Sequence, residues 1–464
     1  MLEFQPCSPG LAAGRADRNQ TLRSLFPTNP LAKPPFSDYP LPFMNDPGFD
    51  WKAIWRGLGP GLLMAGAAIG VSHLMQSTRA GADYGWQLAW LVLAINLVKY
   101  PFFLFGHTYT LATGGSLLEG YLRLGRAWLA GFLLLNTVTA IASIAGVTFV
   151  TAALVQNLTG GSLGVTGWSA ALMAGTTVLL LIGHYRWLDA SMKWVVIALS
   201  IATCATFIAA LIHGPVAPEA PEKSPWDLAA LGFLIALMGW MPAPIELSVW
   251  QSLWIQAKTR ATGAAPTHSQ GLWDFNIGYT LTIVTALMFL GLGALVMHGT
   301  GAAFSDSGAA FAGQVVRIYT ATIGEWSGFW IGLAALGAMI STTATVIDAY
   351  PRSLAVGAKL LAPKLSLDER TLHGALMAAC CAAGLVIVFH FQSTIKGMID
   401  WATTISFLTA PVFAWLNYRL MTDAHLDPSA RPGPLLRIWC WASIVFLTAF
   451  GALYAINRFF PSLL

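Results

Sequence analysis

The chain has 464 residues, of which 56% are hydrophobic and only 10% are charged, and its formal net charge is +4. Soluble domains carry about 25% charged residues, so this composition excludes a soluble globular protein. It predicts an all-α polytopic membrane protein whose partners include the lipid bilayer and no nucleic acid.

The first 55 residues are rich in Pro, Asn and Arg and contain no long apolar run. They predict a flexible cytoplasmic N-terminal tail, in place of a cleavable signal peptide. The transmembrane domain occupies residues 56–464. About 20 apolar residues cross a bilayer, and this length predicts about eleven spans. We expect them near 57–79, 85–111, 127–157, 165–184, 188–212, 228–257, 275–298, 325–350, 372–392, 397–419 and 437–457.

Basic residues are unevenly distributed between the two ends of these spans. With a cytoplasmic N-terminus and an odd number of crossings, most of the 25 Lys and Arg residues fall on the cytoplasmic side. We therefore expect a multi-pass protein of a bacterial inner membrane. Five crossings per half make an inverted repeat, with repeat one near 57–212 and repeat two near 228–419. The helix near 437–457 is an addition.

Two spans, one opening each half, are interrupted halfway across. The first turns polar at Gly70, Ser72 and His73, and the sixth is broken by Pro242 and Pro244. A membrane helix is expected to be uniform, because lipid cannot hydrogen-bond a freed backbone group. Paired interruptions of this kind predict a substrate site at the bilayer midplane of a secondary transporter.

The interruptions offer several ligand groups. Carbonyls freed near Gly70 and Met238 attract cations, while His73, Met241 and Glu246 supply an imidazole, a thioether and a carboxylate. His73 and Glu246 are the candidates for proton coupling. The predicted substrate-binding residues are Gly70, Ser72, His73, Met238, Met241, Glu246 and Thr403.

The same features also have a structural interpretation. A Gly-Val-Ser sequence at Gly70 is typical of closely packed membrane helices. Met241 suits core packing, and His73 can hydrogen-bond between helices. Glu246 favours a role in transport, because a carboxylate inside an apolar span is costly.

Three other charged residues lie within or beside the spans. Lys99 is buried by its position in the second span and needs a partner, which the sequence does not name. Asp348 and Arg352 are four residues apart at a helix end, and this spacing predicts a gating or structural ion pair.

Sequence motifs for catalysis and for nucleotide binding are absent. The chain contains no P-loop or HExxH motif, and its five cysteines form no CxxC pair. We therefore expect neither an enzyme nor an ATP-driven pump, and no cofactor.

Four short motifs carry a resemblance to a known family. They are Gly59-Pro60-Gly61, the run from Arg79 to Trp86, Ala112-Thr113-Gly114, and Met241-Pro242. In this order they resemble the Nramp family of proton-coupled divalent metal transporters, over about residues 55 to 455. The resemblance implies a LeuT-type inverted-repeat fold, in which the first and sixth helices rock against the others to give alternating access.

At the implied metal site the chain departs from this family. Gly70 and His73 stand where the family's first-span motif has a metal-binding Asp and Asn. The family's Met-Pro-His reads Met-Pro-Ala here, which keeps Met241 and loses the histidine. Thr403 stands at the glutamine position of the tenth span.

Two hypotheses for the substrate follow. In the first, a site for a transition metal such as Mn²⁺ or Fe²⁺ is rebuilt from His73, Met241 and Glu246, whose imidazole and thioether are softer than oxygen ligands. It requires His73 and Glu246 to converge on one point at about 2.0–2.3 Å. In the second, the fold moves a different small solute, an anion or a small organic molecule.

Overall fold

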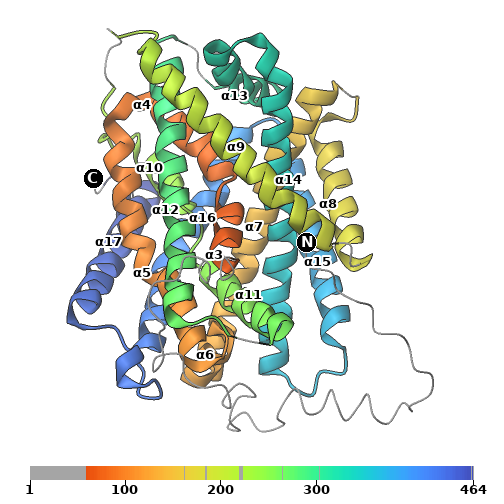
Figure 1. The fold of residues 1–464 in the computed structure, drawn as a ribbon, viewed down its shortest axis with the longest axis vertical. Helices are drawn as coiled ribbons and strands as arrows, with labels where there is room; N and C mark the ends of the chain where they lie inside the picture. The colour runs from red at the N-terminus through yellow and green to blue at the C-terminus, as the bar shows by residue number, and fades with distance from the viewer. Residues whose placement is uncertain are drawn as a thin grey trace.

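The computed structural model describes residues 59–160, 162–182, 185–218, 223–263, 265–301, 304–460 and 462. The predicted N-terminal tail, residues 1–55, lies outside the described residues. The described part of the chain is built from helices and short loops and contains no strand (Figure 1). The predicted all-α class is confirmed.

The helices of the first half surround a broken first span. They are α3 (Pro60–Ala68), the π-helix η1 (Ser72–Ser77), α4 (Thr78–Tyr84), the 3-10 helix η2 (Gly85–Leu88), α5 (Ala89–Thr113), α6 (Leu117–Leu124), α7 (Arg126–Thr159), α8 (Gly164–Ile182) and α9 (Tyr185–His213). α6 is a short helix outside the predicted spans.

The second half also begins with a broken helix. Its elements are α10 (Leu231–Gly239), α11 (Leu247–Thr262), α12 (His268–Leu292), the π-helix η3 (Gly293–Met297), α13 (Gly308–Ile323), the 3-10 helix η4 (Glu325–Ser327), α14 (Gly328–Leu361), α15 (Glu369–His390), α16 (Ile395–Met421), the 3-10 helix η5 (Pro428–Ala430) and α17 (Pro434–Phe459). Eight helical stretches of the described chain are long and apolar enough to cross a membrane. The count of about eleven spans stays a prediction.

The two broken helices lie inside the bundle. α3 packs against α12 and α14, while α10 packs against α16. In Figure 1, α3 lies near the centre of the molecule, with α7, α12 and α16 around it. This arrangement places both breaks within protein, where neighbouring helices satisfy the freed backbone groups.

The outer helices expose large apolar side chains. Trp90 on α5 is 53% exposed, Ile212 on α9 is 79% exposed, and Leu435 on α17 is 84% exposed. Soluble monomers rarely expose broad apolar surfaces, whereas lipid covers them at no cost. Together with the apolar helices, these side chains identify a multi-pass integral membrane protein.

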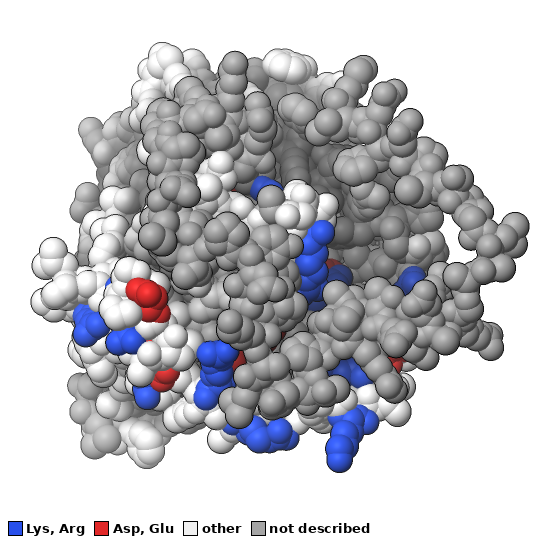
Figure 2. All heavy atoms as spheres, turned by 60° about the horizontal axis from the view of Figure 1, so that its bottom comes forward, with Lys and Arg blue, Asp and Glu red and all other residues white. Residues whose placement is uncertain are grey.

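One end of the molecule carries most of the visible basic side chains. Figure 2 shows Lys and Arg gathered on the face that lies at the bottom of Figure 1, with fewer Asp and Glu among them. The loops that join α6 to α7 and α14 to α15 lie at this end. The basic face fits the predicted cytoplasmic side, and the orientation itself stays a prediction.

Candidate functional site

The first break is centred on Gly70. The helix α3 ends at Ala68, and the amide of Gly70 donates to the Ala68 carbonyl at 2.9 Å. The Gly70 carbonyl then accepts from the amides of His73, at 3.1 Å, and Leu74, at 2.9 Å. A Cβ at Gly70 would lie 2.9 Å from the Thr342 hydroxyl, so glycine permits this close approach to α14.

The second break separates α10 from α11. Pro242 and Pro244 have no amide N–H, so the chain cannot continue as a helix between Trp240 and Glu246. A Cβ at Gly239 would overlap the backbone carbonyl of Thr403, so the end of α10 lies directly against α16. Glu246 stands at the N-cap position of α11, directly before the helix begins.

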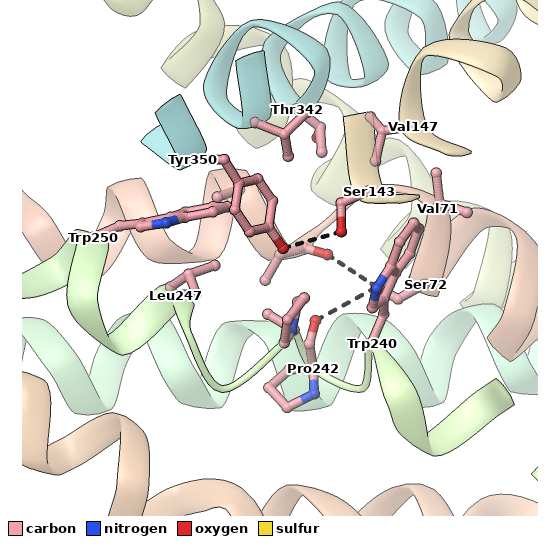
Figure 3. Close-up of a pocket in the computed structure, with 15 residues that line it drawn as sticks. Val71, Ser72, Ser143, Val147, Trp240, Pro242, Leu247, Trp250, Thr342 and Tyr350 are labelled. Carbon is pink, nitrogen blue, oxygen red and sulfur yellow. Dashed lines mark hydrogen bonds between the residues drawn. The ribbon is translucent and has the colours of Figure 1, made fainter. Parts of the chain in front are cut away.

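A small cavity lies between the two breaks. Its volume is about 30 Å³, room for about two water molecules when one needs ~10–15 Å³. Figure 3 shows side chains from both breaks and from α7 and α14 around it. The lining residues are Ala67, Ala68, Val71, Ser72, Ser143, Val147, Trp240, Pro242, Ala243, Pro244, Leu247, Trp250, Thr342, Val346 and Tyr350.

The cavity wall is aromatic and aliphatic with a few hydroxyl groups. None of these described lining residues is charged, and none is a histidine. The Ser72 hydroxyl donates to the Ala68 carbonyl at 3.0 Å and lies 3.5 Å from the Pro242 carbonyl, so it joins the two breaks (Figure 3). On the opposite wall, the Ser143 and Tyr350 hydroxyls are 3.0 Å apart. Such a wall binds neutral polar atoms and apolar surface.

His73 is buried and lies outside the cavity lining. Its Nε2 is 3.0 Å from the Thr282 carbonyl of α12, and its Nδ1 is 2.8 Å from the Ser72 hydroxyl. Both ring nitrogens therefore have hydrogen-bond partners within the protein. Of the predicted substrate-binding residues, Ser72 is the one that lines the cavity.

Glu246 does not line the cavity, but it contacts Tyr350, which does. It is 1% exposed, and its Oε1 accepts a hydrogen bond from the Tyr350 hydroxyl at 3.1 Å. Since Tyr350 also contacts Ser143 and lines the cavity, its hydroxyl connects Glu246 to that space. Trp250 packs edge-on against Tyr350, with ring centroids 4.6 Å apart, and holds it in place.

Lys99 of α5 has its partner at the second break. Its Nζ donates to the carbonyls of Met238 at 2.7 Å, Gly239 at 2.8 Å and Ala243 at 3.1 Å. The carbonyl of Met238, predicted as a substrate ligand, is thus bound by a side chain of the protein.

The other predicted residues make local contacts. Arg352 Nη2 lies 2.6 Å from Asp348 Oδ1 in the spacing that predicted an ion pair, and its gating or structural role stays a prediction. Thr403 donates to the Ile399 carbonyl of its own helix at 2.7 Å. Met241 is fully buried and does not line the cavity.

Two carboxylates important to the broken helices were missed by the sequence reasoning. Asp274 of α12 accepts from the amides of Gly59 at 2.9 Å and Gly61 at 2.7 Å, which anchors the start of α3. Asp400 of α16 lies 2.7 Å from Arg79 of α4. Both lie in or beside apolar spans, so the signal that selected Glu246 would have found them.

The described residues show no ready-made group of metal ligands. No cluster of three or more His, Cys, Asp and Glu side chains is placed to hold a metal ion in the part of the chain that the structure describes. His73, Met241 and Glu246, the predicted ligand set, are not among the residues that line the cavity. Its role in metal binding stays a prediction.

Comparison with known sequences gives one family. The family described as natural resistance-associated macrophage protein-like, or Nramp, matches residues 61–456. An uncharacterized protein of Pasteurella multocida is 41% identical over 411 residues, covering 87% of this chain and 93% of that protein. The divalent metal cation transporter MntH of Chromohalobacter salexigens is 30% identical over 275 residues, covering 56% of this chain and 61% of that one.

Solved structures share the fold at low identity. The H236A mutant of the Eremococcus coleocola manganese transporter gives a TM-score of 0.66 at 14% identity, with 90% of each chain covered. MhsT in complex with L-phenylalanine gives 0.55 at 13% identity, covering 86% of this chain and 98% of that one. These neighbours confirm the predicted LeuT-type architecture with broken helices.

Proposed function

The chain belongs to the Nramp-like family, and from this premise we propose that it is a secondary active transporter working by alternating access. The observation that carries the proposal is the cavity held between two broken helices and the helices α7 and α14. In this mechanism the α3–α4 and α10–α11 pairs move against the other helices and open the cavity to each side in turn. Membership of a transporter family also supports a role other than catalysis.

The first candidate substrate is a divalent transition-metal ion, such as Mn²⁺ or Fe²⁺. A relative named as a divalent metal cation transporter, MntH of Chromohalobacter salexigens, supports it. We propose His73, Met241 and Glu246 as ligands in a state where His73 leaves Thr282. Glu246 is the proposed proton carrier, because Tyr350 links it to the cavity.

The second candidate substrate is a small neutral organic molecule. The chemistry of the cavity wall favours it: Trp240, Trp250 and Tyr350 offer aromatic surface, and Ser72 and Ser143 offer hydroxyls. A divalent ion loses far more hydration energy than these neutral groups return. An anion receives less support, because no described lining residue is a cation.

Uptake of Mn²⁺ into proteoliposomes, with and without an inward proton gradient, separates the two candidates. Metal transport predicts saturable uptake that is lost in Glu246→Gln and His73→Ala but kept in Glu325→Gln, an exposed carboxylate that serves as the matched control. Absence of both Mn²⁺ uptake and calorimetric Mn²⁺ binding excludes the metal. Small organic compounds are then tested for saturable thermal stabilisation.

The organisation of the domain is part of the same proposal. We propose that residues 57–212 and 228–419 are inverted repeats, since each opens with a helix broken in the middle. We also propose a cytoplasmic N-terminus in a bacterial inner membrane, which the basic face in Figure 2 supports.

A further inference from the structure

The end of α10 is a cation site by its backbone geometry. The last carbonyls of a helix lack amide partners within it and carry partial negative charge. At this end, the Met238 carbonyl accepts from the amides of Trp240 and, at 3.4 Å, of Met241, and Pro242 and Pro244 supply no further amide. The carbonyls of Met238, Gly239 and Ala243 are close enough together to share one donor atom. Three converging carbonyl oxygens attract a small cation.

The atom that fills this site is the Nζ of Lys99. Lys99 lies within α5, and its side chain is fully buried. It donates to all three carbonyls at 2.7–3.1 Å. A neutral amine has two N–H donors and an ammonium group has three, so only the ammonium donates to all three carbonyls at once. The geometry therefore favours the charged form of Lys99.

A buried cation is tolerated in a protein when its donors are hydrogen-bonded. The three carbonyls supply these hydrogen bonds to the buried Lys99 side chain. The second break thus contains a cation site whose ligands and occupant both come from the chain.

We propose that Lys99 is a built-in cation that permanently occupies a small-cation site at the second break, in place of a free ion. The proposal rests on the proposed transport function, because it concerns which ions the transporter loads. In this proposal the carbonyls of Met238, Gly239 and Ala243 bind Lys99. They are therefore not available to bind a substrate or a coupling cation. Removing the lysine side chain should open a site for a small alkylammonium ion.

The test measures thermal unfolding of the purified full chain in detergent, with no transport assay. The variants are Lys99→Ala, which opens the site, and Lys99→Met, which fills the same volume without charge. Butylammonium chloride is the probe, and butanol at the same concentration is the neutral control. Lys364→Ala removes an exposed lysine and should behave as the unmodified protein does.

Both Lys99 variants should unfold about 5 °C or more below the unmodified protein, because three buried carbonyls each lose the hydrogen bond from Lys99. Butylammonium should restore Lys99→Ala saturably, whereas butanol should not. Lys99→Met and the unmodified chain should not respond to either compound. Equal responses of Lys99→Ala to the two compounds, or a normal unfolding temperature for Lys99→Met, would overturn the proposal.

Lys99→Gln covers the case in which Lys99→Ala does not fold. Its amide keeps two N–H donors and similar length but lacks the charge. It should still unfold below the unmodified protein, and an unchanged unfolding temperature would show that no cation is needed there. Because none of these measurements involves a substrate, they remain valid whichever solute is transported, and even if transport is not found.

Discussion

The two breaks satisfy their freed backbone groups in opposite ways. At the first break, the partners are local, since the carbonyls of Ala68 and Gly70 accept from residues at most four positions away. At the second break, the carbonyls accept from Lys99, which is more than a hundred residues earlier in the chain. The carbonyls of the first break therefore find their donors locally, whereas those of the second are tied to the Lys99 side chain of α5.

This difference places neutral groups at the cavity and charges behind it. The first break contributes the Ser72 hydroxyl to the cavity wall. Lys99 and Glu246 lie outside the lining, and Glu246 is connected to the cavity through the Tyr350 hydroxyl. A conformational change that moves α10 must carry Lys99 along or break three hydrogen bonds, whereas the first break can rearrange within its own residues.

The largest expected effect comes from Gly239→Ala at the second break. The added methyl group overlaps the Thr403 backbone, which cannot rotate away. Separation of α10 from α16 should lower the free energy of unfolding by about 3 kcal/mol, the upper end for overpacking. Denaturant titration in mixed micelles measures this loss. Gly232→Ala, with open space around its Cβ, is the matched control on the same helix. Equal stability of the two variants would show that α10 is not held against α16.

Tyr350→Phe tests the link between the charged break and the cavity. It removes the hydroxyl that donates to Glu246 Oε1 at 3.1 Å and keeps the ring against Trp250. Hydrogen bonds to charged groups contribute about 1.5–3 kcal/mol, so the free energy of unfolding should fall by about 2 kcal/mol.

The same variant should weaken the dependence of uptake on the proton gradient, because Glu246 loses its connection to the cavity. Uptake at two internal pH values measures this dependence. Tyr319→Phe is the control, since it removes a buried hydroxyl that contacts Thr203 away from the cavity. If both variants keep full proton dependence, Tyr350 does not connect Glu246 to the substrate.

The sequence predicted where the helices break but not where the side chains beside each break point. Gly70 and the two prolines mark the breaks by their own backbone properties, which any surrounding fold would respect. The direction of His73 depends on η1, a π-helix that turns less per residue than an α-helix. The sequence does not reveal this π-helix, so it does not determine the direction of the His73 ring.

The partner of Lys99 was beyond sequence reasoning for another reason. A lone buried lysine shows that a partner exists, because an unpaired charge is too costly in a membrane. Its acceptors are backbone carbonyls, which every residue carries, so side-chain identity gives no signal. In contrast, the pairing of Asp348 with Arg352 was visible because both are charged and four residues apart on one helix.

Gly70→Ala is the counterpart of Gly239→Ala at the first break and should cost less. The added methyl group meets the side chain of Thr342 at 2.9 Å, and a side chain can move where a backbone cannot. The free energy of unfolding should fall by about 1 kcal/mol. A second change, Thr342→Ser, should recover most of this loss, since it removes the methyl group 3.0 Å from the new Cβ. A loss as large as that of Gly239→Ala would contradict the view that the first break is the more adaptable one.

The smallest effect on stability is expected for Ser72→Ala, which tests whether the neutral wall binds substrate. The variant removes one hydroxyl that donates to the Ala68 carbonyl and lies near the Pro242 carbonyl. Such a hydrogen bond contributes about 0.5–1.5 kcal/mol to the free energy of unfolding.

If the Ser72 hydroxyl also contacts the substrate, the KM for uptake should rise several-fold while kcat changes little, because binding energy is lost equally in the bound and transported states. Thr409→Val, which removes a hydroxyl bonded within α16 and away from the cavity lining, should leave the KM unchanged. A normal KM for Ser72→Ala would assign recognition to the opposite wall, at Ser143 and Tyr350, and would leave the first break with a purely mechanical role.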